Sequence, residues 1–519
     1  MNPNIRYGRN LFLLLCLTLA AFLSGCVSFK ANHPTLEPAP ARADTRIALA
    51  LQELTDAHPG ESGYYLLPDG ADSFLARIAA IELAEDSIEA QYFIFKNDLT
   101  GRLFLDRLLA AADRGVKVRL IVDDLAKTWK DRYLAAAVVH PNFELRLFNP
   151  ATRIGSVRIL HDLAKVAKMH RRMHNKQLVI DGKLAIIGGR NIANEYFGAS
   201  DRNVVDLDSI VIGEIVPDFS RIFEDYWAYS LSVPVEKVAL QKKLSQEKHD
   251  EFRAQLAEWN ESEETQAYLD RIQQETLLPN LNQRAIPFYW GKAYVYADDP
   301  KKLDNIRYNE DTHLMPDLIP YAEEAEESML LISPYFIPGR KGSEWLGAIA
   351  EKGVNVAVVT NSLDSNDHPL VHSAYMKYRK RLLKSGVQLL ETNAIAGGKE
   401  SDPRLRDFSA GSLLHTKLFI IDKHYVMIGS TNLDPRSRLL NTELMTVFES
   451  PKLAANIIDI WQLESDGKFW ELKLGENEQI VWQENSDAPA EPVSIEPGTT
   501  WWERQKLRLL RLIPIEEQL

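Results

Sequence analysis

The chain repeats one pattern of helices and strands in its two halves. Residues 89–95 and 331–337 are apolar, strand-like runs, and residues 112–122 and 350–360 each combine a helix end, a glycine and a strand. The offset between matched segments runs from 238 residues, between 112 and 350, to 243 residues, between 144 and 387. The repeat predicts an α/β fold class of two lobes, each a mixed sheet covered by helices.

Each half also contains one copy of the motif H-x-K-x4-D. Copy one is His174, Lys176 and Asp181, and copy two is His415, Lys417 and Asp422. A G-[GS]-x-N segment follows each copy, as Gly188-Gly189-Arg190-Asn191 and as Gly429-Ser430-Thr431-Asn432. The two histidines lie 241 residues apart, inside the range of the repeat offset. Two motifs with matched extensions at this offset are not a chance occurrence.

Strand geometry predicts how each copy is arranged. Alternation places His174 and Lys176 on one face of a strand and turns Asp181 to the opposite face. Asp181 and its counterpart Asp422 are therefore predicted to be structural. The Asp-Gly pair after the first strand indicates a tight hairpin, which returns Asn191 to the neighbourhood of the histidine. The second copy is predicted to form the same patch.

If the two lobes face each other, the two patches form one anion-binding active site at their interface. One histidine can attack phosphorus while the other protonates the leaving alcohol. The two lysines, with Asn191 and Asn432, can stabilise charge on the phosphoryl oxygens. Substrate contacts are also predicted for Gly189, Ser430 and His372, with a position on a helix surface weighed equally for His372. No cofactor and no metal are expected, since no Asp, Glu and His cluster has ligand spacing.

The two motifs resemble the signature of the phospholipase D superfamily. This resemblance implies a covalent phosphohistidine on one histidine, while the other acts first as acid and then as base. The family usually assigns the attack to the first copy, which implies His174, although the symmetry of the sequence leaves His415 open. The resemblance also implies an acidic residue after the Asn of each copy, which accepts a hydrogen bond from the far nitrogen of the histidine of that copy. Glu443 matches it in copy two, and Asp208 is preferred over Glu195 in copy one because it opens an apolar strand run.

Within that superfamily, the chain resembles bacterial cardiolipin synthases, in particular those of the C type. The segments that carry this resemblance include Arg172-Met173-His174-Asn175-Lys176, Glu195-Tyr196-Phe197, Asp434-Pro435-Arg436-Ser437 and Asn441-Thr442-Glu443. It implies transfer of a phosphatidyl group, with phosphatidylethanolamine as donor, to a hydroxyl of phosphatidylglycerol. A phospholipase D that releases phosphatidic acid shares every catalytic residue and stays an alternative.

A nuclease and an inactive membrane scaffold are less favoured alternatives. The net charge of −13 argues against a nucleic-acid partner, because such binding rests on Lys and Arg that neutralise phosphates. Both half-sites are complete, which argues against an inactive scaffold. The expected partners are membrane phospholipids and the membrane surface, and no accessory protein is identified. His161 and His368 are predicted to have no chemical role.

The N-terminus predicts a lipoprotein of the bacterial cell envelope. Residues 11–23 are an apolar stretch of secretory length, and Leu23-Ser24-Gly25-Cys26 resembles a lipobox that ends in an acylated Cys26. Val27 after the cysteine favours a periplasm-facing protein at the outer membrane; an uncleaved anchor is the alternative. The only cysteines are Cys16 and Cys26, so the rest of the chain contains no disulfide or thiol nucleophile.

The expected organisation of the chain follows from these features. It comprises a signal peptide at 1–25, a lipid-anchored linker at 26–55, lobe 1 at 56–234, a helical insertion at 235–290, lobe 2 at 291–475 and a C-terminal tail at 476–519. The tail contains a basic, tryptophan-bearing amphipathic helix at 501–512. Such a helix either lies in a membrane interface or docks on the protein body.

Overall fold

The computed structural model describes residues 41–151, 170–238, 245–272, 286–304, 308–366, 368–393, 413–486, 490–511 and 516. The predicted signal peptide, Cys26 and His161 lie outside these ranges. Within them, we find no helix with the length and apolar character that a membrane span requires.

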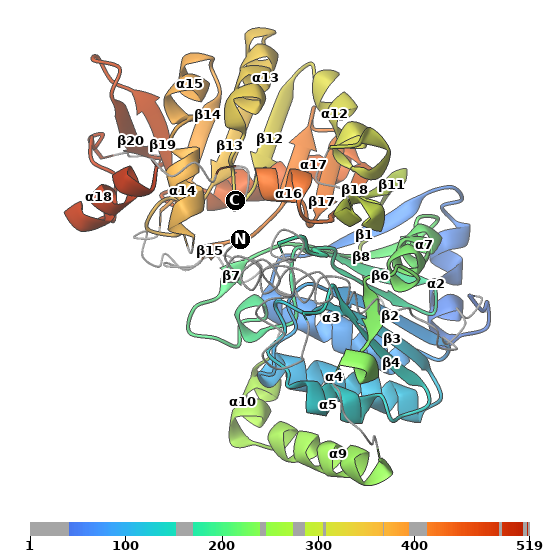
Figure 1. The fold of residues 1–519 in the computed structure, drawn as a ribbon. Coiled ribbons are helices and arrows are strands. Elements are labelled where there is room, and N and C mark those ends of the chain that lie inside the picture. Colours follow the sequence, from blue (N-terminus) through green and yellow to red (C-terminus); the bar gives the residue numbers. More distant parts are fainter. Residues whose placement is uncertain are drawn as a thin grey trace, which may run out of the picture. The chain divides into compact units, whose positions relative to one another are not determined.

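Two nine-stranded sheets form two α/β lobes (Figure 1). The strands of the first sheet, in spatial order, are β10 (Tyr289–Gly291), β1 (Ser62–Leu67), β8 (Asp208–Gly213), β6 (Leu184–Gly188), β5 (Gln177–Ile180), β2 (Ser87–Tyr92), β3 (Lys117–Asp123), β4 (Phe143–Phe148) and β9 (Ser232–Pro234). The strands of the second sheet are β11 (Ala293–Ala297), β18 (Leu444–Glu449), β17 (Tyr425–Gly429), β16 (Leu418–Ile421), β12 (Ser328–Ile332), β13 (Asn355–Thr360), β14 (Gln388–Thr392), β19 (Phe469–Leu474) and β20 (Ile480–Glu484).

The two sheets share the same internal order. In each, three parallel strands, β2-β3-β4 or β12-β13-β14, continue into an antiparallel block, β5-β6-β8 or β16-β17-β18. The predicted two-lobed α/β fold with an internal repeat is therefore confirmed. A third, two-stranded sheet pairs β7 (Val204–Val205) of the first lobe with β15 (Leu413–Leu414) of the second.

Helices cover the two sheets. The first lobe and its insertion contain α2 (Arg46–Asp56), α3 (Gly70–Leu83), α4 (Leu99–Asp113), α5 (Asp131–Ala137), α7 (Val216–Trp227), α8 (Val235–Val238), α9 (Gln246–Asn260) and α10 (Glu263–Ile272). The second lobe and the tail contain α12 (Met315–Glu323), α13 (Gly339–Glu351), α14 (Pro369–Tyr375), α15 (Arg379–Lys384), α16 (Pro435–Leu439), α17 (Pro451–Glu464) and α18 (Trp501–Leu510).

Helix α7 shows why these helices pack where they do. Its buried residues Phe219, Ile222, Phe223 and Tyr226 recur at helical spacing and form one apolar face. That face packs on β2, β5, β6 and β8 of the first sheet. Helices α9 and α10, within the predicted insertion, pack instead on α3, α4 and α5 at the outer side of the first lobe (Figure 1).

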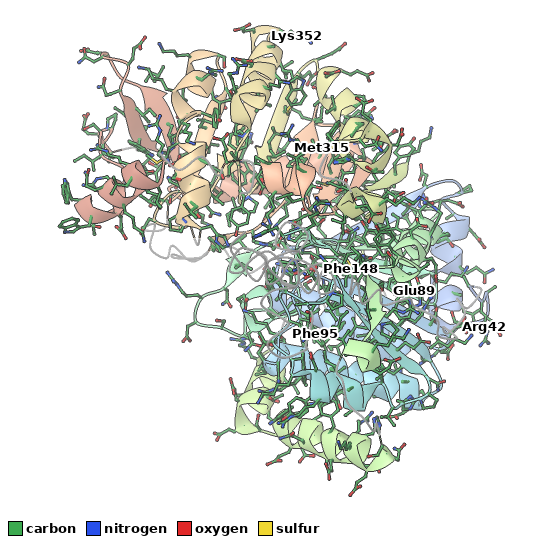
Figure 2. All side chains as sticks on the ribbon, viewed as in Figure 1. Arg42, Glu89, Phe95, Phe148, Met315 and Lys352 are labelled. Atoms are coloured by element: carbon green, nitrogen blue, oxygen red, sulfur yellow. The ribbon has the colours of Figure 1, made fainter. Side chains whose placement is uncertain are left out.

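The two lobes share one hydrophobic core. The ring of Tyr64 in β1 stacks on Phe448 in β18 at 4.1 Å, and residues of β6, α7, β17 and α17 belong to the same buried cluster. Figure 2 shows Phe95 and Phe148 inside the first lobe, where both are buried, and Lys352 at the outer edge of the second. A shared core fixes the interface at which the repeat was predicted to place its two half-sites.

Three predicted boundaries differ from the structure. Helix α2 lies almost wholly inside the predicted linker at 26–55 and contacts β8. Strand β5 begins at Gln177, so His174 and Lys176 precede the strand instead of lying on one of its faces. The predicted boundary at residue 475 falls between β19 and β20, which pair with each other in the second sheet.

Candidate active site

Asp181 and Asp422 fasten the motif hairpins to the sheets. The Asp181 carboxylate accepts hydrogen bonds from the backbone N–H groups of Glu85, Asp86 and Ser87, at the start of β2. Asp422 accepts the equivalent three from residues 326–328, at the start of β12. Both aspartates have positive φ, 50° and 51°, as their turns require. The geometry agrees with the predicted structural role.

Each motif histidine lies where the backbone of its own lobe contacts the opposite lobe. The backbone N–H of His174 donates to the carbonyl oxygen of Thr442 at 2.8 Å, and that of His415 donates to Val205 at 2.7 Å. The imidazole Nδ1 atoms also contact the opposite lobe. Nδ1 of His174 lies 2.8 Å from the Glu443 carboxylate, and Nδ1 of His415 lies 2.5 Å from that of Asp206. Each histidine therefore depends on a carboxylate of the other lobe, and the predicted pairing with the carboxylate of its own copy was wrong.

The carboxylate prediction for copy one was wrong by two residues. Asp208 opens β8 as expected, but its carboxylate turns into the first lobe, where Ser73 Oγ donates at 2.7 Å and Arg77 Nη2 at 2.8 Å. Asp206 precedes the strand and reaches His415. Glu443 lies one residue before β18 and Asp206 two residues before β8, so both carboxylates that reach a histidine come from the segment just before the strand. The competitor Glu195 pairs with Lys96 at the cleft wall.

Glu443 is held by a set of donors. The hydroxyls of Ser430 and Ser437 donate to its carboxylate at 2.5 and 2.7 Å, and its backbone N–H donates to Asp298 at 2.8 Å. Ser430, predicted to bind substrate, is thus engaged with Glu443 and does not line the cleft. Ser437 and Asp298 were missed by the sequence prediction. Ser437 stands in one of the segments that carry the family resemblance, whereas Asp298 lies outside both motifs.

Gly189 makes room for Asp206. A Cβ atom at this position would lie 2.2 Å from Asp206 Oδ1, so no side chain fits without moving the carboxylate. The predicted contact with substrate was wrong, since Gly189 does not line the cleft. The glycine serves the site through Asp206.

The variant Gly189→Ala should therefore lose activity. Displacing Asp206 misorients His415, and we expect about a 10²-fold lower kcat with a stability cost of roughly 1–3 kcal/mol. Steady-state rates and thermal unfolding measure the two effects. Gly353→Ala is the matched control: it has positive φ and open space around its Cβ, so it should cost stability only. Equal kcat in Gly189→Ala and wild type would contradict this role.

Both motif lysines are buried behind their histidines. The ammonium of Lys176 donates to the carbonyl oxygen of His174 at 2.6 Å, and Lys417 makes the same bond to His415. The Lys417 ammonium also lies 2.8 Å from Nδ1 of His415. Burial and the charge of Lys417, opposed by Glu443, lower the pKa of Lys176 to about 7. The electrostatic influence of each lysine on the opposite half-site shows that the two halves form one site.

A single cleft joins the two half-sites. Its lining includes His174, Asn191, Tyr196, Val204, Tyr335, His368, Leu413, His415, Asn432, Asp434 and Arg436. The Asn191 side-chain oxygen accepts from the backbone of Ile94, while its buried Nδ2 has no partner among the described residues. Asn432 has a buried, unpartnered Oδ1 in the same part of the chain. Unpartnered buried amides at a cleft are positioned to bind a polar ligand.

Both imidazoles have pKa values below the ordinary range of histidine, which favours their neutral form. Burial lowers the pKa of His174 to about 4 against the opposing effect of Glu443, and burial with Lys417 lowers the pKa of His415. His174 and Lys176 outweigh burial and hold the pKa of Glu443 below its usual range. A neutral imidazole that donates its Nδ1–H to a carboxylate keeps its Nε2 lone pair for chemistry. Phe93 packs edge-on against His174 and Tyr196 against His415, which restricts rotation of both rings.

His372 and His368 both lie in surroundings that differ from the predicted ones. His372 lies neither at the cleft nor on a helix surface. It is buried, with Nε2 2.8 Å from Glu496 and 2.9 Å from the Arg379 guanidinium. His368, predicted to be inert, lines the cleft at the start of α14. Among the described residues, no group of three or more His, Cys, Asp and Glu side chains is placed to hold a metal ion.

Two lobes that each give a histidine and an asparagine to one cleft, with a buried lysine behind each histidine, define an enzyme of the phospholipase D type. The family model described as "Cardiolipin synthase, PLD-like domain" matches residues 78–227 and 318–462, and the chain belongs to this family within the phospholipase D superfamily.

Named relatives agree with this assignment. Cardiolipin synthase C of Escherichia coli (strain K12) is 36% identical over 91% of this chain and 99% of its own length. Cardiolipin synthase 1 of Bacillus cereus is 24% identical over 76% of this chain and 64% of its own length. The crystal structure of phosphatidylserine synthase from Haemophilus influenzae matches with a TM-score of 0.55 at 13% identity, over 92% of this chain and all of that one. This last likeness supports the fold.

Proposed function

We propose that the protein is a phospholipid phosphatidyltransferase that forms cardiolipin from two phospholipids. The observation that carries this proposal is the pair of histidines in one cleft, each oriented by a carboxylate from the opposite lobe. Two imidazoles provide both groups that double displacement at phosphorus needs, a nucleophile and a proton donor. The extended identity to a cardiolipin synthase supports phospholipids as substrates.

The reaction proceeds in two displacements. Nε2 of His174 attacks phosphorus of the donor, proposed to be phosphatidylethanolamine, and the leaving alkoxide takes a proton from His415. His415 then removes the proton from a hydroxyl of phosphatidylglycerol, whose oxygen displaces His174 and forms cardiolipin. The lysines, Asn191 and Asn432 stabilise charge on the phosphoryl oxygens. The fuller set of donors around Glu443 supports His174 as the nucleophile, because a fixed carboxylate holds its imidazole in one orientation.

Hydrolysis of the same phosphohistidine is the competing outcome. If water reaches the intermediate before the second lipid, the product is phosphatidic acid. Expression in a bacterium that lacks cardiolipin, followed by mass spectrometry of its lipids, distinguishes the two. We expect cardiolipin with wild type and none with His174→Ala. Phosphatidic acid without cardiolipin would refute the transferase.

Binding of a phosphate-like anion should take up a proton. Burial and Lys417 lower the pKa of His415 and favour its neutral form, whereas an anion beside it raises that pKa and favours the charged form. We therefore expect uptake of about one proton near pH 7, measured as the dependence of the calorimetric enthalpy of phosphate binding on buffer ionisation. The His415→Ala variant should show a smaller dependence, and the remainder is expected from Lys176, whose pKa lies at about 7. A buffer-independent enthalpy for wild type would contradict the assigned protonation states.

We further propose that residues 1–25 are a signal peptide and that Cys26 carries a lipid anchor that faces the periplasm, at the outer membrane. The small residues before Cys26 and the apolar stretch before them support this. Labelled palmitate should be incorporated into wild type and lost in Cys26→Ser. Unchanged labelling of that variant would refute the anchor.

A further inference from the structure

Exposed hydrophobic side chains gather in one C-terminal segment. Of the eleven large hydrophobic residues that are exposed in the described ranges, five lie between residues 493 and 509. They are Val493 (39% exposed), Ile495 (60%), Trp501 (55%), Trp502 (75%) and Leu509 (69%). A cluster of this kind on a folded protein marks an interaction surface.

Helix α18 presents Trp501, Trp502 and Leu509 because it is docked by its other side. Its one buried residue, Leu507, faces the protein, and the helix packs on α14. Trp502 and Leu509 are seven residues apart, two helical turns, and therefore share the outward side. A capping box between Thr500 and Glu503 fixes the start of the helix. The sequence left two alternatives, a helix docked on the protein body and a helix in a membrane interface. One side of α18 is docked on the protein, and the side that carries its tryptophans is exposed.

The same segment is basic in an acidic protein. Four cationic side chains, Arg504, Lys506, Arg508 and Arg511, stand against the single acid Glu503 between residues 501 and 511, although the whole chain carries a net charge of −13. Tryptophans beside Lys and Arg on an exposed helix are the pattern of an interfacial membrane helix. Cations next to inserted apolar groups complement a bilayer that carries anionic lipid.

The segment is attached to the wall of the catalytic cleft. Asp364 and His368 line the cleft, and α14 begins directly after them. Gly498 lies against Asp364, where an added Cβ would be 2.3 Å from the carboxylate. Glu496 joins the segment to α14 and α15 through His372 and Arg379. Lipid binding by this segment would place the bilayer beside the cleft wall that Asp364 and His368 form.

We propose that residues 493–511 form a membrane-docking surface for bilayers that contain anionic phospholipid. Trp501, Trp502 and Leu509 enter the lipid interface, and the basic side chains contact the headgroups. The docking delivers substrate under the function proposed above, but it needs no turnover and is tested without it.

The distribution of tryptophan makes a direct test possible. All ten tryptophans lie in the described ranges, and only Trp501 and Trp502 are exposed. Full-length protein is reconstituted into phosphatidylglycerol-containing vesicles whose lipids carry bromine on their acyl chains, which quenches tryptophan fluorescence on contact. We expect about two-fold less quenching in Trp501→Phe/Trp502→Phe than in wild type. The matched control Trp259→Phe/Trp290→Phe, with half-buried rings, should be quenched like wild type.

Quenching reports lipid contact of the rings, so an anchor elsewhere in the chain does not mask the result. The inactive His174→Ala variant should be quenched like wild type, which separates docking from catalysis. Equal quenching of wild type and Trp501→Phe/Trp502→Phe would overturn the proposal. Equal quenching of wild type in anionic and in purely zwitterionic brominated vesicles would overturn the preference for anionic lipid.

Discussion

His174→Ala and His415→Ala should each reduce phosphatidyl transfer by at least about 10³-fold, because neither half-site supplies both the attack and the proton. Steady-state transfer between vesicle lipids measures the loss. His58→Ala is a suitable control, since that ring stacks on Trp290 and does not line the cleft. Substantial residual activity in either motif variant would refute the mechanism with two histidines.

A substrate with an activated leaving group separates the two histidines. A phosphatidyl ester of nitrophenol leaves without protonation, so it removes the need for an acid in the first displacement. With this ester, His415→Ala should release a burst of nitrophenol and retain the phosphatidyl group on the protein, whereas His174→Ala should give no burst. The reverse pattern would assign the attack to His415.

The second large effect distinguishes the two aspartates on either side of Leu207. Asp206→Asn should lower kcat by about 10²–10⁴-fold with little change in stability, because an amide cannot orient the His415 imidazole as the carboxylate does. Asp208→Asn should instead lower the free energy of unfolding by roughly 3–5 kcal/mol, since Arg77 would stay buried without its counter-charge. Chemical denaturation and initial rates, measured on both variants, test the contrast.

The contrast between Asp206→Asn and Asp208→Asn can be contradicted by one result. If Asp208→Asn stays folded and loses as much kcat as Asp206→Asn, the assignment of Asp206 to His415 is wrong. Glu443→Gln should resemble Asp206→Asn in kcat, because it removes the equivalent support from His174.

The sequence predicted those features that follow from periodicity and spacing. The offset between the two motif copies predicted the two lobes, the Asp181-Gly182 turn predicted the first hairpin, and the repeat predicted the equivalent hairpin at Asp422. The chemical roles of His174 and His415 could be predicted from their residue types and from the repetition of the motif alone. These are local properties of the chain, or properties of a repeat, and both are visible without knowledge of the packing.

The remaining features depend on contacts between distant segments. Whether Asp206 or Asp208 reaches a histidine depends on where β8 begins, and an error of two residues there changes the partner from His415 to Arg77. Ser430 has the same neighbours in sequence whether it faces the substrate or Glu443. His372 is buried by Glu496, 124 residues later in the chain, and no local pattern indicates that pairing.

The exchange of carboxylates between the lobes bears on how such a chain arose. One repeat contains a histidine and an acidic residue, but the acidic residue serves the histidine of the other repeat. An ancestral protein with a single copy of this lobe would have been active only as a two-fold symmetric pair. Duplication and fusion then preserved within one polypeptide an arrangement of subunits, and afterwards allowed Asp in one copy and Glu in the other to diverge.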